Sequence, residues 1–163
     1  MVSSEKESVR NTKTRDKFYN QGREPEDWWS EIKRTHGHVG PWNVLGWRIG
    51  RAALREFDTK WGRHKLDVIC YVPLRTPYSC IADGLTVGTG NTLGRLDLRL
   101  AEVFSLDFIH VCVKRRDGKG SALTFKPVQK YLRHIDAVKP EHLEEFSKEC
   151  SKMAESDLFE VCL

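Results

Sequence analysis

The chain has 163 residues, of which 39% are hydrophobic and 31% charged, an ordinary composition for one globular domain with a substantial core. No run approaches the ~20 apolar residues of a membrane-spanning helix, and the polar start MVSSEKESVRNTKTRDK lacks the apolar stretch of a signal peptide. We therefore expect no membrane association and a cytoplasmic location. The net charge of +4 is mild, and no basic face with interleaved aromatic residues indicates a nucleic-acid partner.

Five cysteines are scattered singly, with no CxxC pair, which argues against a disulfide framework and against a zinc ribbon. At the N-terminus, basic residues outnumber acidic ones and apolar residues are few. Such a segment cannot bury enough surface to fold by itself. We predict a flexible basic N-terminal arm over residues 1–23 and a single domain over residues 24–163.

Two helices are expected at the start of the domain. The acids and proline of EPED suit a first helical turn and predict a helix over residues 25–35, which is followed by His36. A second helix begins at Pro41, because its apolar residues recur at spacings of three and four. Gly46 and Gly50 lie four apart on this helix and allow another backbone to approach closely. We expect this helix to pack against a sheet or a partner.

The middle of the chain is typical of a sheet. The apolar run LDVICYV predicts a buried strand, and YSCIADGLTVGTGNTLG predicts a short helix that opens into a Gly/Thr-rich loop. Three more strands are expected over residues 95–100, 104–114 and 121–128, followed by helices from 128 to 153. The predicted fold class is α+β: N-terminal helices, a mixed, largely antiparallel sheet of about four strands, and C-terminal helices.

His36 and His38 flank a single glycine just before the second helix. The positive end of a helix dipole lowers the proton affinity of a nearby imidazole, and a metal or a proton shuttle needs the neutral ring. The intervening glycine lets the two rings converge. A helix-capping histidine with a partly buried neighbour is the alternative interpretation, and this pair alone leaves both open.

A second group of polar residues follows the first predicted strand. Cys80 and Asp83 are three residues apart and so share one face of a helix. The next segment, VGTGNTLGR, offers backbone N–H groups, hydroxyls and an arginine that could hold an anion or a carbonyl. The alternative is a Gly-rich connection beside a buried cysteine, because a free cysteine behaves as a small hydrophobic residue.

The order of HGHVGPWNVLGWRIG and SCIADGLTVGTGNTLGR resembles the FmdE family, also written FwdE-like, which takes its name from formylmethanofuran dehydrogenase. The ending LFEV is similar to the Leu-Phe-x-Val close of that family. The resemblance covers residues from about 30 to 162. It implies a mixed α+β fold, a homodimer in many cases, and in several members a bound transition metal, usually zinc.

Carried onto this chain, the resemblance implies a metal site and an adjacent pocket. The implied metal ligands are His36, His38 and Cys80, with Asp83 close by. The implied pocket residues are Thr89, Thr92 and Arg95. Many members of the family have a cysteine where this chain has Gly40, which could be a further thiolate ligand, while other members have Gly-Pro there, as this chain does.

Three functions follow from these observations. The first is a metal-binding protein, with Zn²⁺ held by histidine and cysteine, water in an open position, and Asp83 as a catalytic base. The second is an accessory subunit of a molybdenum or tungsten formylmethanofuran dehydrogenase. The third is a non-catalytic carrier of a small molecule or cofactor. The metal content of the purified protein distinguishes the metal-binding protein from the carrier. Co-purification with a larger enzyme distinguishes the accessory subunit from both.

Overall fold

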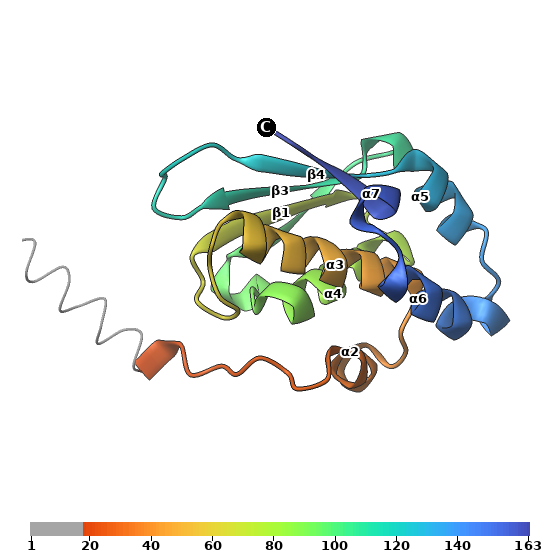
Figure 1. The fold of residues 1–163 in the computed structure, drawn as a ribbon, viewed down its shortest axis with the longest axis horizontal. Coiled ribbons are helices and arrows are strands. Elements are labelled where there is room, and N and C mark those ends of the chain that lie inside the picture. The colour runs from red at the N-terminus through yellow and green to blue at the C-terminus, as the bar shows by residue number, and fades with distance from the viewer. Residues whose placement is uncertain (1–17) are drawn as a thin grey trace, which may run out of the picture.

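The computed structural model describes residues 18–163. One layer is a five-stranded sheet, α3 and α4 form a second layer against it, and α2 lies on the far side of these helices (Figure 1). The helices are α2 (Trp28–His36), α3 (Pro41–Glu56), α4 (Ile81–Thr89), α5 (Gln129–Asp136), α6 (Leu143–Lys152) and α7 (Glu155–Leu158). The strands are β1 (Leu66–Val72), β2 (Leu98–Glu102), β3 (His110–Arg115), β4 (Leu123–Pro127) and β5 (Phe159–Cys162).

The sheet is mixed and mostly antiparallel. Its strand order is β2-β1-β3-β4-β5. β1 and β2 are parallel, with Val68 opposite Leu98, and α4 connects them as a crossover, while the other three pairings are antiparallel. These features confirm the predicted α+β class, with helices before and after the strands.

The strands differ from the sequence prediction in number and limits. β5 was not predicted, because it has only four residues and most of them are exposed. The strand expected over residues 104–114 begins only at His110, since Leu106–Phe108 form a 3-10 turn that the Ser105 hydroxyl caps by accepting from the Asp107 N–H. β2 begins later than expected because Leu93–Arg95 form another such turn.

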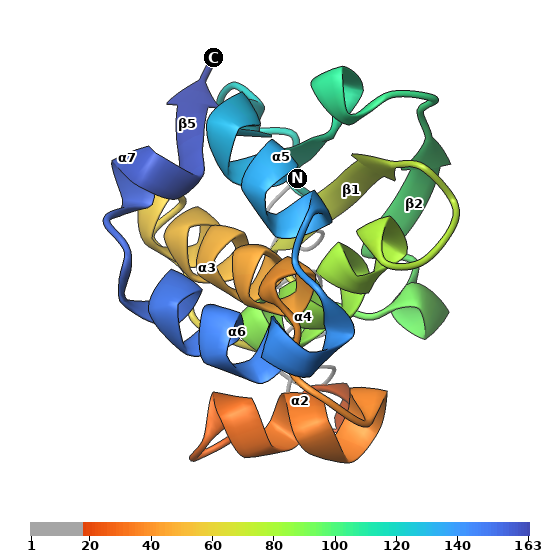
Figure 2. The same cartoon turned by 90° about the vertical axis from the view of Figure 1, so that its right-hand side faces the viewer.

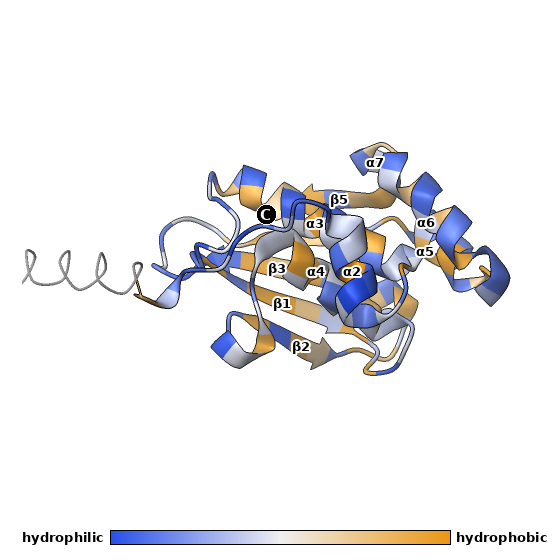
Figure 3. Cartoon of the chain, turned by 90° about the horizontal axis from the view of Figure 1, so that it is seen from below, coloured by the Kyte–Doolittle hydropathy of each residue, from blue (hydrophilic) through white to orange (hydrophobic). Residues whose placement is uncertain are grey.

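The core lies between the sheet and the α3–α4 layer. Buried side chains of β1 and β3, among them Val68 and Val113, form one apolar cluster with Leu45 and Ile49 of α3. Hydrophobic residues concentrate along β1 and the strands beside it (Figure 3). On the other side of α3, Trp47 stacks on Trp28 of α2 with 3.9 Å between ring centroids and 13° between planes. This stack attaches α2 to the body of the domain.

α3 and α4 are in direct backbone contact. A Cβ built on Gly46 would lie 2.0 Å from the carbonyl oxygen of Ile81, and one built on Gly84 would lie 2.0 Å from that of Asn43. A Cβ on Gly50 would lie 3.2 Å from the Cα of Gly88. The expected close approach of another backbone is confirmed, but helix α4 of the same chain supplies it at the glycine face, and not the sheet or partner that we expected.

Residues 1–17 of the predicted arm lie outside the described residues. From Phe18 to Glu26, a segment that we call the N-terminal strap, the chain leads to α2 in a mostly extended path (Figure 1). Arg95 donates a hydrogen bond to the carbonyl oxygen of Tyr19 at 3.1 Å, and Gly22 lies beside Trp61. Over residues 18–163, no helix combines the length and the apolar character needed to cross a membrane.

We expect Gly46→Ala to destabilise the domain by about 3 kcal/mol, because the added methyl group would collide with the α4 backbone, which cannot move aside as a flexible side chain can. The control is Gly94→Ala, where an added Cβ meets nothing within 4 Å. Urea unfolding of the two variants measures the difference. Equal free energies of unfolding would contradict the close contact between α3 and α4.

Candidate functional site

His36 and Asp83 are the closest polar pair among the predicted site residues. His36 is the last residue of α2, which ends in the left-handed conformation of Gly37. Its Nδ1 lies 2.6 Å from Oδ2 of Asp83 in the first turn of α4. Because a carboxylate only accepts, Nδ1 of the neutral ring carries the proton and Nε2 keeps its lone pair. The pair joins α2 to α4 although 47 positions separate the residues.

His38 lies beside His36. The two ring centroids are 4.8 Å apart and the planes are tilted by 52°, so the glycine between them does bring the rings together. Partial burial of the ring, and secondly the neighbouring His36, lower the pKa of His38. The direction agrees with the predicted neutral imidazole. His36 lies at the end of the first helix, as predicted, so the nearest helix terminus is the negative end of the α2 dipole and not the positive end of α3.

Cys80 precedes α4, and Asn43 connects it to the histidine segment. The side chain of Asn43 is fully buried; its Oδ1 accepts from the Gly40 N–H at 2.9 Å, and its Nδ2 donates to the Cys80 carbonyl oxygen at 3.1 Å. Burial, and secondly the carboxylate of Asp83, raise the pKa of the Cys80 thiol. The N-terminus of a helix favours a thiolate, and burial of Cys80 outweighs that effect here.

The fit of these residues to a metal ion is partial. Two imidazoles lie side by side, and one has the carboxylate partner that metal-binding histidines usually have. Within residues 18–163, however, no three or more His, Cys, Asp and Glu side chains are grouped so that they could hold a metal ion. The structure therefore brings together His36, His38 and Asp83, and it does not bring the Cys80 thiol into a three-ligand group.

The Gly/Thr-rich segment divides into a helical part and a loop. Thr89 is buried at the end of α4, where its hydroxyl donates to the Leu85 carbonyl oxygen at 2.7 Å. Thr92 and Asp83 line a cavity of about 260 Å³ between α4 and the N-terminal strap. Arg95 is turned to the strap, where it donates to Tyr19 and to the Asn20 side chain at 2.9 Å. Of the three predicted pocket residues, Thr92 lines this cavity, and Thr89 and Arg95 do not.

A second histidine–aspartate pair was not identified from the sequence. Asp97 is fully buried, and its Oδ2 lies 2.6 Å from Nδ1 of His64. Its Oδ1 accepts from the Thr92 N–H at 2.9 Å, while Asn91 donates to the backbone carbonyl oxygens of Leu66 and Asp97. These bonds fix the Gly/Thr loop to the sheet. In the sequence, the feature that could have pointed to Asp97 is its position as an acidic residue directly before the apolar strand β2.

A family model described as FmdE, Molybdenum formylmethanofuran dehydrogenase operon, matches residues 35–160. The match spans His36, His38, Cys80 and the Gly/Thr segment, and it leaves out the N-terminal strap. No curated protein matches the chain.

We expect His38→Asn to lessen the loss of stability in mild acid. Because the folded-state pKa of His38 is lowered from its ordinary value of 6.5, protonation favours the unfolded chain. The contribution of the neutral ring is complete above this value and is lost as the pH falls through the lowered pKa. Urea midpoints between about pH 7 and about pH 5 measure the effect. The control is His142→Asn at an exposed position, and an unchanged pH slope in His38→Asn would contradict the assignment.

Proposed function

The chain belongs to the FmdE family, and we propose that it is a metal-binding protein of this family in which His36 and His38 supply two ligands and Cys80 the third. The observation that carries the proposal is the hydrogen bond between His36 and Asp83 beside the ring of His38. A carboxylate on Nδ1 orients the ring and makes its Nε2 a better ligand. Nitrogen and sulfur donors together suit Zn²⁺ better than Mg²⁺ or Ca²⁺.

Metal binding by this set requires a change at Cys80. Its thiol is nearly buried and its pKa is raised, so an ion must displace the proton and draw the sulfur toward the histidines. Protons therefore compete at both kinds of ligand, and affinity should fall as the pH is lowered. When bound, Zn²⁺ would supply Lewis acidity and an activated water. We assign it no reaction step, because the fit of the residues is partial.

Gly40 is the position at which the donor set can be completed. Its backbone is extended, with φ −111°, a conformation that any residue adopts. A Cβ built there would lie 3.7 Å from Nε2 of His38, an ordinary contact distance. A cysteine at this position would put a thiol beside the ring of His38 without collision. The geometry therefore supports the idea that the family's cysteine and His38 contribute to one site.

The cavity beside the histidines is the proposed ligand pocket. Thr35, Thr86 and Thr92 line it with Asp83, and their hydroxyls suit a small polar molecule. The side chain of Asp83 is 56% exposed, and Oδ2 is occupied by His36. The other carboxylate oxygen is the one that could accept a proton from a bound molecule, in keeping with the proposed role of Asp83 as a base. A carrier without catalysis would use the same cavity.

A role as an accessory subunit of a formylmethanofuran dehydrogenase is the second candidate. The description of the family supports it, and so does the uncovered side of the sheet, which carries no helix in the described part of the chain (Figure 2). Near that side, Phe104 and Phe108 are 89% and 64% exposed. Large exposed aromatic side chains are typical of binding surfaces. Co-purification of a molybdenum or tungsten enzyme with this protein from native extract tests this candidate. The cytoplasmic location expected from the sequence remains a prediction.

We expect His38→Ala and Cys80→Ala each to lose most of the bound zinc while far-UV circular dichroism stays native. The wild type should contain zinc after expression in zinc-replete medium and purification without a nickel column. His142→Ala is the matched control, since His142 is exposed on the 3-10 turn before α6. The zinc content per chain, measured by elemental analysis, gives the result. In the opposite direction, Gly40→Cys adds a thiol beside His38 and should raise the zinc affinity about tenfold.

Two outcomes would show that the metal proposal is wrong. One is a wild-type protein without zinc after metal-replete expression. The other is full zinc occupancy in both His38→Ala and Cys80→Ala. In either case the bond between His36 and Asp83 would serve to attach α2 to α4.

We also expect a homodimer, with a mass in sedimentation of twice 18.8 kDa. The glycine face of α3 cannot form the dimer interface, because α4 covers it. We therefore propose the uncovered side of the sheet as the interface. On that side Tyr71 stacks on His110. Tyr71→Glu should shift the equilibrium toward monomer, and Lys119→Glu in the β3–β4 turn is the control. A wild-type monomer at micromolar concentration would contradict the prediction.

A further inference from the structure

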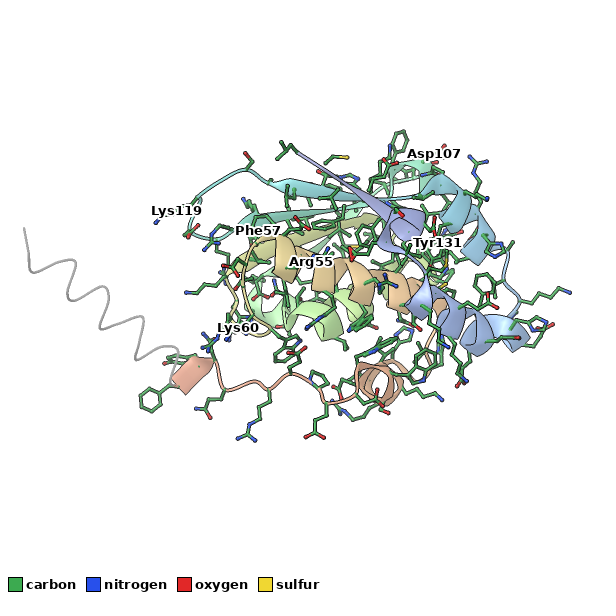
Figure 4. All side chains as sticks on the ribbon, viewed as in Figure 1. Arg55, Phe57, Lys60, Asp107, Lys119 and Tyr131 are labelled. Atoms are coloured by element: carbon green, nitrogen blue, oxygen red, sulfur yellow. The ribbon has the colours of Figure 1, made fainter. Side chains whose placement is uncertain are left out.

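A basic cavity of about 520 Å³ lies beside Trp61. Its walls come from the C-terminal half of α3, the loop between α3 and β1, and the N-terminal strap. Four basic side chains line it, from Arg51, Arg55, Lys60 and Arg63, against the single acid Glu24. Figure 4 labels Arg55 on α3 and Lys60 in the loop. Trp61 lines both this cavity and the one that contains Asp83.

Two of the four cations are already paired. Arg51 forms an ion pair with Glu24 of the strap. Arg55 makes a two-point contact with Glu155, at 2.9 and 2.8 Å. Within residues 18–163, neither Lys60 nor Arg63 has a side-chain ion pair. The lining therefore carries unneutralised positive charge, which favours a bound anion.

The floor of the cavity is fixed in place. The indole N–H of Trp61 donates to the Val87 carbonyl oxygen at 2.9 Å, and the Gly62 N–H donates to that of Thr89 at 2.9 Å. Gly62 has a positive φ of 66°, and a Cβ on Gly90 would come within 2.8 Å of its backbone. The loop that carries Lys60 and Arg63 is thus anchored to the end of α4. Such anchoring lowers the entropic cost of binding.

Glu24 shows that this cavity accepts a carboxylate. The N-terminal strap places the carboxylate of Glu24 against Arg51. This carboxylate therefore neutralises one of the basic side chains from within the protein. A ligand with more than one negative charge would engage Lys60 and Arg63 and compete with Glu24 for Arg51. The volume lies within the range of small-molecule sites, and guanidinium groups are suited to phosphate oxygens.

We propose that the cavity is a binding site for a small phosphate-bearing polyanion, with Lys60 and Arg63 as its main contacts and Glu24 as an internal competitor. This site lies apart from the proposed metal ligands, so its test does not depend on metal binding.

The first test is calorimetric titration of the full chain with inorganic pyrophosphate at low ionic strength. The wild type should show saturable binding with one site per chain, and Lys60→Ala/Arg63→Ala should weaken it about tenfold or more. Arg116→Ala/Lys119→Ala is the matched control. It removes the same charge from the exposed β3–β4 turn and should change affinity less than about twofold, the effect expected of the change in net charge alone.

The second test predicts a gain in pyrophosphate affinity instead of a loss. Glu24→Gln removes the internal competitor and should tighten pyrophosphate binding about threefold. Glu26→Gln makes the same change in net charge on the same strap, away from the cavity, and should leave the affinity unchanged.

Three outcomes would overturn the proposal. They are the absence of saturable binding by the wild type at about millimolar pyrophosphate, equal losses in the Lys60/Arg63 and Arg116/Lys119 variants, and equal effects of Glu24→Gln and Glu26→Gln. A single-stranded oligonucleotide that displaces pyrophosphate with an affinity that rises with its length would also overturn it. That result would identify an open nucleic-acid surface instead of a small-ligand site.

Discussion

The backbone contact between α3 and α4 determines where the polar residues of this protein lie. Gly84 rests against the carbonyl group of Asn43, and Gly46 rests against that of Ile81. Asp83 is the neighbour of Gly84 in sequence, and Cys80 is the neighbour of Ile81. This contact requires glycine at positions 46 and 84. It places Asp83 and Cys80 near the N-terminal end of α3, where His38 and Asn43 are found. A looser pairing of the helices would move Asp83 out of reach of His36.

Much of the fold follows from local sequence patterns. The spacing of apolar residues after Pro41 predicts α3, and LDVICYV predicts β1, because both elements bury one regular set of side chains. The short edge strand β5 and the turn at Leu106–Phe108 have no such pattern. Their conformations depend on tertiary pairing with β4 and on the cap from Ser105.

The candidate site was predictable only in part, for a related reason. His36 and His38 are neighbours in sequence, so their proximity could be anticipated from the glycine between them. The bond from His36 to Asp83 and the burial of Cys80 depend on how two helices pack. The pair formed by His64 and Asp97 spans a strand and a crossover helix. No short motif encodes it, and only the folded chain shows that this carboxylate is fully buried.

The stacked indoles of Trp28 and Trp47 give the protein an optical reporter of its own. Two aromatic chromophores 3.9 Å apart and nearly parallel couple their electronic transitions. The coupling contributes a signal to circular dichroism that vanishes when the rings separate. Because Trp28 belongs to α2 and Trp47 to α3, this signal follows the docking of α2, and with it the approach of His36 to α4. The attachment of one short helix can thus be monitored in the unlabelled chain, independently of global unfolding.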